Sequence, residues 1–469
     1  MKYVSTRTGS GPDAPAVGFL DAILSGLAPD GGLYVPEVWP ELTHAEIAAF
    51  AGQPYHRVAA EVLSRFTGGE IPADVLDEMC EEAYSTFTHT ATCPVKQLSP
   101  GLFMVELFHG PSLAFKDVAM QLLGRLYDYA LSRHGRTMTV VCATSGDTGG
   151  AAVEAFRGRS NARIVALFPE GRISEVQRRF MTTAGESNVA CVSVDGTFDD
   201  CQAIVKAMFG DDQFRNAVDL SGVNSINFAR IAAQAVYYFT AAVALGAPHR
   251  PVAFAVPTGN FGDAFAGWVA QRMGLPIAHI LVATNSNDIV ARAFETGRYA
   301  RGVVAATQSP SMDIQVASNF ERLYYESVRR DGVETGRAFR AFNETGIIDL
   351  PPQALAAMRE TFSGASVTED DTARTMLSTL NETGELIDPH TAVAVSAARR
   401  ASLPDATTPI AILSTAHAAK FPDAVSAATG VTPDVPASAQ GITGKPERYD
   451  HLPADADAIM AYVRAFASK

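Results

Sequence analysis

The chain has 469 residues, and its 37 lysines and arginines against 51 aspartates and glutamates give a formal net charge of −14. Hydrophobic residues make up 47% and charged residues 19%, a globular composition that excludes collagen, coiled coil and intrinsic disorder. The acidic balance repels phosphate backbones, so we expect no nucleic-acid partner. The longest mostly apolar stretch, residues 231–247, is shorter than the roughly 20 residues of a membrane span, so we expect no membrane segment.

The cysteines and the first residues of the chain predict in which cellular compartment the protein works. The five cysteines are odd in number and contain no C-x-x-C pair, which disfavours a disulfide framework and a zinc site. The first 15 residues contain no apolar segment typical of a signal peptide. We therefore expect a cytoplasmic protein with free thiols and without a metal site.

The first 95 residues read as mostly helical. Residues 42–52 and 71–87 have helical spacing, and Thr43 with Glu46 three residues later predicts a capping box at the start of the first of these helices. Residues 30–40 are rich in glycine and proline and are expected to form a loop.

From residue 102 onward, strands and helices alternate. The strands are expected at 102–108, 137–144, 162–169, 188–194, 251–257, 279–285 and 409–415. The helices are expected at 114–135, 150–158, 172–185, 198–210, 226–246, 264–274, 331–346, 351–364, 416–430 and 455–469. Because the strands are continuous runs of apolar residues, they predict parallel sheets buried on both faces by crossover helices.

Three strands end in small polar residues that lead at once into a helix, at 142–150, 255–263 and 411–419. Glycine lets such a loop turn several backbone N–H groups toward one point, and the helix start adds partial positive charge. We expect these loops to bind phosphate or carboxylate groups. They match neither G-x-G-x-x-G nor the P-loop pattern, which disfavours a dehydrogenase or a P-loop NTPase.

Lys116 stands at a helix start among apolar neighbours. Desolvation there disfavours the ammonium form, and a neutral amine forms Schiff bases with aldehydes. The alternative, a lysine that reaches solvent beside Asp117, stays open on these residues alone. His109 and His417 are either general bases or structural hydrogen-bonding residues.

Taken together, the ordered segments resemble the threonine synthases, pyridoxal-phosphate (PLP) enzymes related to the β subunit of tryptophan synthase. The matching segments are residues 3–7, 26–36, 108–117, 143–152, 257–267, 283–288, 309–323, 387–394 and 414–422. Mild departures are Ala418, where the family usually has proline, and Ser112, where it often has threonine. The resemblance implies PLP fold type II: two open, twisted, largely parallel sheets flanked by helices, plus a mostly helical N-terminal region.

The resemblance also implies a division into domains. We expect an N-terminal helical region, a larger α/β cofactor domain in two segments, a smaller α/β domain and a C-terminal extension, at residues 1–95, 96–135 with 250–430, 136–249 and 431–469 respectively. No long linker marks these boundaries.

Residue roles follow from the same resemblance. Lys116 matches the lysine that holds PLP as a Schiff base and later moves protons, and Thr415 matches the hydroxyl facing the pyridine nitrogen. The loop that cradles the cofactor phosphate is matched by Gly259, Asn260, Phe261, Gly262 and Asp263. The loop that takes the substrate carboxylate is matched by Thr144, Ser145, Asp147 and Thr148.

The implied reaction converts O-phospho-L-homoserine and water into L-threonine and phosphate by γ-elimination and β-addition of water. Lys96, Arg157 and Arg230 are candidate cations for the substrate phosphate. A PLP-dependent phospholyase or dehydratase that gives a 2-oxo acid, and a silent binding protein on the same fold, remain alternatives. The sequence leaves the oligomeric state open between monomer and homodimer.

Overall fold

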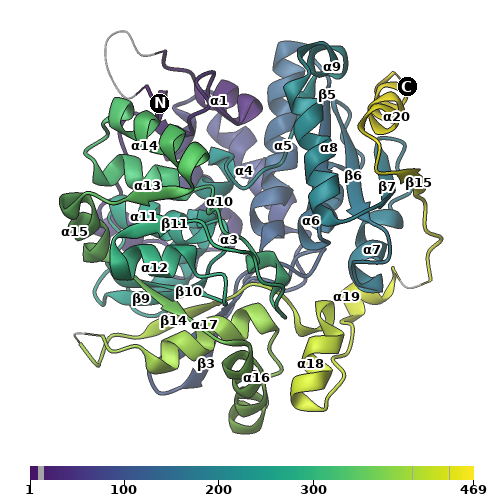
Figure 1. Ribbon diagram of the computed structural model, residues 1–469. Coiled ribbons are helices and arrows are strands. Elements are labelled where there is room, and N and C mark those ends of the chain that lie inside the picture. Colours follow the sequence, from purple (N-terminus) through teal and green to yellow (C-terminus); the bar gives the residue numbers. More distant parts are fainter. Residues whose placement is uncertain (9–14, 404, 443, 469) are drawn as a thin grey trace.

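Two sheets of mainly parallel strands carry the fold, one in each half of the molecule (Figure 1). The computed structural model describes residues 1–8, 15–403, 405–442 and 444–468. The larger sheet has six strands in the order β13-β10-β9-β14-β4-β3. Their bounds are β3 (Val95–Ser99), β4 (Leu102–Glu106), β9 (Val252–Pro257), β10 (Ile277–Thr284), β13 (Phe362–Ser366) and β14 (Ile410–Ser414). Neighbours are parallel except for the β3–β4 pair, which is antiparallel.

The smaller sheet has five strands, all parallel, in the order β15-β7-β6-β5-β8. They are β5 (Met138–Ala143), β6 (Ala162–Pro169), β7 (Val189–Asp195), β8 (Leu220–Ser221) and β15 (Asp450–Pro453). The expected PLP fold type II architecture, with two largely parallel sheets, is confirmed. The domain boundaries themselves stay predictions.

Helices cover the sheets. Those around the smaller sheet are α6 (Asp147–Phe156), α7 (Glu175–Thr182), α8 (Phe198–Gly210), α9 (Asp212–Val218) and α20 (Ala456–Ala467). Two long helices, α5 (Lys116–His134) and α10 (Phe228–Ala244), lie between the halves, and α11 (Gly262–Arg272) packs between α10 and the strands β9 and β10 of the larger sheet. The remaining helices of the larger half are α12 (Ile289–Thr296), α13 (Phe320–Ser327), α14 (Gly332–Thr345), α15 (Pro352–Thr361), α16 (Glu369–Thr383) and α17 (Pro389–Arg400).

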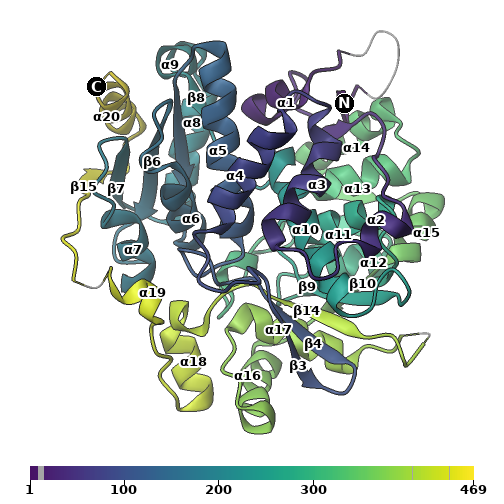
Figure 2. The same cartoon turned by 180° about the vertical axis from the view of Figure 1, so that it is seen from behind.

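The N-terminal helices cover the back of α5 and α10 (Figure 2). They are α1 (Phe19–Ser25), α2 (His44–Ala48), α3 (Tyr55–Thr67) and α4 (Ala73–Tyr84). The predicted capping box is confirmed, because Thr43 accepts from the Glu46 N–H while the Glu46 carboxylate accepts from the Thr43 N–H. This region is mostly helical, as expected.

Residues 30–40, however, are more than a loop. β2 (Tyr34–Pro36) pairs antiparallel with β1 (Tyr3–Ser5), and both strands are fully buried. Glycine and proline in this segment predict a turn, whereas the strand forms because residues from the chain's start lie alongside it.

Four strands of the two sheets, β3, β8, β13 and β15, lie outside the strands expected from the sequence, and the helix expected over 351–364 ends at Thr361, so that its last expected residues belong to β13. Of these strands, β13 and β15 lack the apolar alternation of a strand. β13 is small and polar, and a Cβ on its Gly364 would lie 2.5 Å from the Ala291 Cα, so the glycine is required by close packing of α12. β15 is mostly exposed and contains Pro453 at its end, which an edge strand tolerates.

Helix boundaries also differ from expectation in three places. α6 and α11 begin at Asp147 and Gly262, inside the segments expected to be loops. The helix expected over 416–430 is split into a 3-10 turn, η2 (Ala418–Lys420), and α18 (Pro422–Thr429), because Pro422 lacks an N–H and starts a new helix. In the larger half, the short strands β11 (Arg298–Ala300) and β12 (Ile347–Asp349) pair with each other. The elements η1 (Pro310–Met312) and α19 (Ala437–Gln440) are single helical turns.

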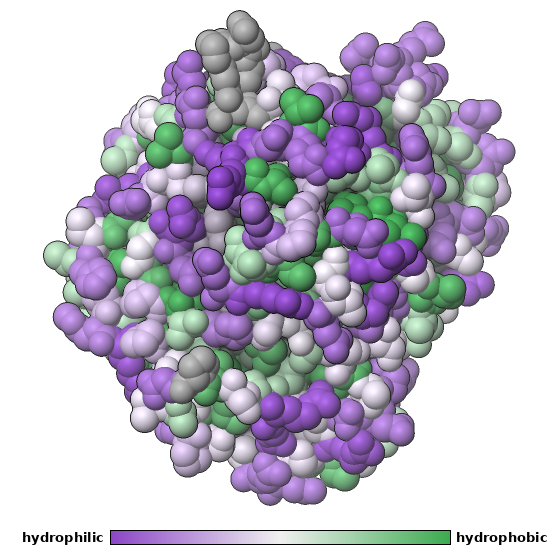
Figure 3. All heavy atoms as spheres, turned by 60° about the vertical axis from the view of Figure 1, so that its left-hand side comes forward, coloured by the Kyte–Doolittle hydropathy of each residue, from purple (hydrophilic) through white to green (hydrophobic). Residues whose placement is uncertain are grey.

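Three further features of the molecule are the state of its cysteines, the hydrophobicity of its helices and the character of its surface. All five cysteines are buried and unbridged. Across the described ranges, none of the helices combines the length and apolarity that crossing a bilayer requires. The face in Figure 3 is a mosaic in which hydrophobic patches are separated by hydrophilic residues.

The crossing of α5 and α6 generates a stability prediction. A Cβ on Gly124 of α5 would lie 2.2 Å from the Ala155 carbonyl oxygen of α6, so Gly124→Ala must push these helices apart. We expect it to lower the free energy of unfolding by about 1–3 kcal/mol, measured by urea denaturation, despite alanine's better helix propensity.

Gly210→Ala is the matched control, because this helical glycine has nothing within 4 Å of its added Cβ. It should be neutral or slightly stabilising. Equal effects of the two substitutions would contradict a close crossing of α5 and α6.

Candidate active site

The loops that follow three adjacent parallel strands, β4, β14 and β9, meet at one edge of the larger sheet. Lys116 is the first residue of α5, and the residues before it are tied to the loop after β14. Phe115 donates its N–H to the Thr415 carbonyl over 2.8 Å, and Ala114 forms a bridge with Ala416. Since carboxyl ends of parallel strands are where α/β sheets bind ligands, Lys116 stands where chemistry is expected.

The amine of Lys116 is buried, with 12% of its side chain exposed. Burial lowers its pKa to about 8, and the nearby cations Lys420 and Arg230 also lower it, while Asp147 opposes them. The Asp147 Oδ2 atom is 3.9 Å from the Lys116 Nζ atom, which is beyond hydrogen-bond distance. At pH 7 about a tenth of Lys116 is therefore a free amine, far more than for a lysine with the ordinary pKa.

The loop between β9 and α11 presents unpaired backbone donors. Phe261 has a positive φ of 62° and caps α11. Among the described residues, the N–H groups of Gly259, Asn260 and Gly262 donate to no protein acceptor. A Cβ on Gly259 would lie 2.9 Å from the Ser311 carbonyl oxygen, so only glycine leaves this cradle open. A row of free N–H groups at a helix start fits a phosphate.

The Asp263 carboxyl does not point into this cradle. It accepts hydrogen bonds from Tyr237 and Tyr238 of α10, and its Oδ2 atom has no partner in the described part of the chain. Burial raises the pKa of Asp263 to about 7. Only its backbone can contribute to anion binding, whereas its side chain fastens α11 to α10.

Thr415 and the two candidate histidines surround the turn before Lys116. Thr415 is buried directly after β14. His109 pairs with Glu106, with 2.7 Å between Nε2 and Oε2, and His417 accepts from the Ala419 N–H at the start of η2. Both histidines are thus engaged in structural hydrogen bonds.

The loop after β5 is closed by its own side chain. The Thr144 hydroxyl accepts from the N–H groups of Gly146 and Gly149, at 2.9 and 2.8 Å. Ser145 and Thr148 are half-buried. In the described structure, the N–H groups of Asp147 and Thr148 at the start of α6 donate to no protein acceptor, so the backbone here also fits an anion.

The Asp147 carboxylate faces the other half of the molecule. It accepts from Lys420 Nζ at 2.9 Å, from Ser311 Oγ at 2.9 Å and from Gln177 Nε2 at 3.1 Å. Although burial alone would raise its pKa, Lys420 and Lys116 together hold it well below the usual range. Lys420 has 1% of its side chain exposed and lies in a matching segment, but its neighbours along the chain do not indicate a role for it.

The three candidate phosphate-binding cations differ in whether a carboxylate is already paired with them. Lys96 pairs with Glu385 at 2.6 Å, and Arg157 pairs with Glu154 and Glu186 at 2.8 and 2.7 Å. Arg230, in the first turn of α10, has no carboxylate partner in the described residues.

Arg230 is nearly fully buried, and its Nη1 donates to the Val223 carbonyl at 2.9 Å. Its Nε has no acceptor in the described part of the chain. Burial lowers its pKa to about 10, so it remains a cation at neutral pH. An unpaired buried guanidinium is costly unless an anion joins it.

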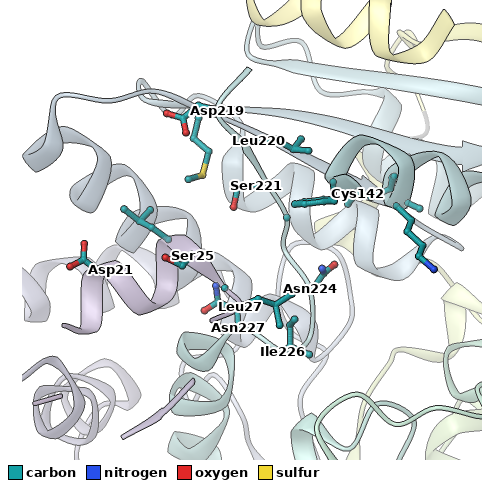
Figure 4. A pocket seen from close by; sticks show the side chains of 18 of the residues that line it. Asp21, Ser25, Leu27, Cys142, Asp219, Leu220, Ser221, Asn224, Ile226 and Asn227 are labelled. Carbon is teal, nitrogen blue, oxygen red and sulfur yellow. The ribbon is translucent and has the colours of Figure 1, made fainter. Parts of the chain in front are cut away.

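A cavity with a volume of about 730 Å³ lies beside this site. Figure 4 shows Ser25 and Leu27 near the end of α1, Ser221 of β8, and Asn224 in the loop before α10. Lys116 does not line it, but Cys142 and Ala143, directly before Thr144, do. The cavity therefore reaches the edge of the site without containing the reactive amine.

Family comparisons match this chain along nearly its whole length. Residues 2–84 match the family described as threonine synthase N terminus, and residues 391–463 match the C-terminal region of threonine synthase. Residues 86–348 match the family of pyridoxal-phosphate-dependent enzymes.

Relatives and solved structures agree. A threonine synthase of Pseudomonas aeruginosa is 46% identical over 466 residues, covering 99% of this chain and 98% of that protein. A PLP-bound threonine synthase structure from Brucella melitensis is 52% identical, with a TM-score of 0.97 and complete coverage of both chains. The yeast threonine synthase structure is 36% identical, with a TM-score of 0.93, and covers 100% of this chain and 99% of that chain.

The buried Asp263 carboxyl predicts a pH effect. Between the ordinary aspartate pKa of about 4 and the folded value of about 7, the folded protein keeps a proton that the unfolded chain has lost. Raising the pH from 5 to 7 should therefore lower the free energy of unfolding of the native protein, by about 2 kcal/mol more than that of Asp263→Asn.

Urea denaturation of both proteins at pH 5, 6 and 7 measures this difference. The asparagine retains an oxygen that can accept from both tyrosines, so it removes the titration and keeps those bonds. Parallel pH profiles for the two proteins would show that Asp263 is ionised in the fold.

Proposed function

Because the chain belongs to the threonine synthase family of PLP-dependent enzymes, we propose that it converts O-phospho-L-homoserine and water into L-threonine and phosphate. The observation that carries the proposal is the buried amine of Lys116, with its pKa lowered to about 8, beside two helix starts with free N–H groups. A reactive amine among several anion-binding groups fits a cofactor and a substrate that both carry phosphate.

The residues present fit PLP. Lys116 supplies the amine for its aldehyde, the open cradle at Gly259 and the N–H row toward Gly262 fit its phosphate, and Thr415 offers a hydroxyl for its ring. When bound, the cofactor supplies an electron-withdrawing ring that stabilises negative charge on carbons near the linked nitrogen.

The chain's own residues then bind the substrate and move its protons. In this proposal the N–H groups of Asp147 and Thr148 bind the substrate carboxylate and Arg230 binds its phosphate. The support is that these N–H groups and the Arg230 Nε have no acceptor among the described residues. With a pKa of about 8, Lys116 can take a proton from the carbon next to the substrate nitrogen and return it later near neutral pH. The buried position of Lys116 limits the access of bulk water to its amine while these protons move.

Product analysis tests this function. Incubation with PLP and O-phospho-L-homoserine should release phosphate and threonine in equal amounts, and Lys116→Ala should abolish both because no amine replaces it. Phosphate with 2-oxobutanoate would instead identify a lyase that gives a 2-oxo acid. Release of no product by a PLP-loaded chain would identify a silent binding protein.

The role of Arg230 has its own test. Removing the buried cation should weaken binding of the substrate phosphate, so Arg230→Gln should raise KM at least about tenfold and lower kcat less. Lys96→Gln is the matched control, since Lys96 is already paired with Glu385, and it should leave KM unchanged. An unchanged KM in Arg230→Gln would overturn the assignment.

A further inference from the structure

A second lysine of the site, Lys420, is the last residue of η2 and contacts the same carboxylate, Asp147, that faces Lys116. Its Nζ donates to the Ser112 carbonyl oxygen at 2.7 Å and to Asp147 Oδ1 at 2.9 Å, and it lies over the Phe180 ring, 5.5 Å from the ring centroid. It is one of the most deeply buried charged groups in the chain, and the roles assigned above leave it unused.

Asp147 has two oxygens with different partners. Oδ1 is held by Lys420 and Gln177, whereas Oδ2 accepts from Ser311 and faces Lys116 at 3.9 Å. The carboxylate is thus hydrogen-bonded to Lys420, whereas Lys116 lies beyond hydrogen-bond distance from it. In a buried site an uncompensated carboxylate at that distance would draw the Lys116 ammonium into a close ion pair.

We propose that Lys420 is a positioning residue that takes up the charge of Asp147, so that Lys116 remains a free, reactive amine instead of an ion-paired ammonium. This inference deepens the proposed function and rests on the role given there to Lys116. Lys420 does not need to touch substrate for this role, because it acts through the carboxylate.

The other charged groups around Lys116 come from each element packed against it. Asp117 of α5 is bound by the Ser112 N–H and hydroxyl, and Arg230 of α10 adds a second cation. His390 of α17 accepts from the Ser311 N–H and pairs with Asp388, so it supports Asp147 through Ser311. Of these groups, Lys420 is the cation in direct contact with Asp147.

The test compares Lys420→Met, Asp147→Asn and the double variant. In the full chain free of PLP, competitive acetylation followed by peptide mass spectrometry gives the reactivity of Lys116 against pH. In Lys420→Met, the unbalanced carboxylate should raise the pKa of Lys116 and lower its labelling at pH 7.5 about threefold to tenfold. The double variant should recover most of that loss, because the carboxylate that Lys420 neutralises is gone.

The same variants are measured for threonine formation. Lys420→Met should lose about 100-fold or more in kcat/KM, and adding Asp147→Asn should restore at least about tenfold. The matched control is the double variant Lys96→Met, Glu385→Gln, which removes a lysine and a carboxylate that are 2.6 Å apart and have no proposed role in the reaction. It should change neither the labelling of Lys116 nor the rate of threonine formation.

Each outcome decides the proposal. Additive losses, or unchanged Lys116 labelling in Lys420→Met, would overturn it. If Lys420→Met does not fold, a folded double variant with normal labelling supports it, and a double variant that also fails to fold overturns it. Since labelling needs neither PLP nor substrate, a wrong substrate assignment would leave its result intact.

Discussion

The burial of opposite charges at one point is the constraint on which this site depends. Lys420, Asp147 and Asp117 are buried, Lys116 has only 12% of its side chain exposed, and both lysines lie within 4 Å of the Asp147 carboxylate. A buried charge is costly unless partners surround it, so each of these groups fixes the position of the others. The 110–117 turn, η2 and the start of α6 are therefore held together by ion pairs and hydrogen bonds in addition to apolar packing.

Sheet topology brings these charges together from distant parts of the chain. Lys116 follows β4, Lys420 follows β14, and Asp147 follows β5 of the other sheet. Because β4 and β14 are parallel neighbours, their carboxyl ends bring the two lysines to the same edge of the sheet, where each faces one oxygen of Asp147. Asp147 and its partners Lys420 and Ser311 thus join the two halves of the molecule through one carboxylate.

Much of this was predictable from the sequence, for physical reasons that differ from residue to residue. The apolar strands, the Thr43 cap and the helix that starts at Lys116 depend on local chemistry, which a sequence displays directly. β13 and β15 were missed because they gain their strand pairing from distant neighbours rather than from their own composition. From the sequence, Lys420 has no assigned role and Arg230 cannot be separated from the candidates Lys96 and Arg157, since a cation's role depends on which carboxylates lie near it in space.

The C-terminal strand has a consequence for synthesis. β15 completes the edge of a sheet whose other strands lie between residues 138 and 221, and α20 packs on α8 and α9 behind it (Figure 1). While the ribosome makes the intervening residues, the apolar β7 edge stays without its neighbour. An open strand edge is a template for association with other chains, so the nascent chain remains vulnerable to aggregation until its last residues emerge.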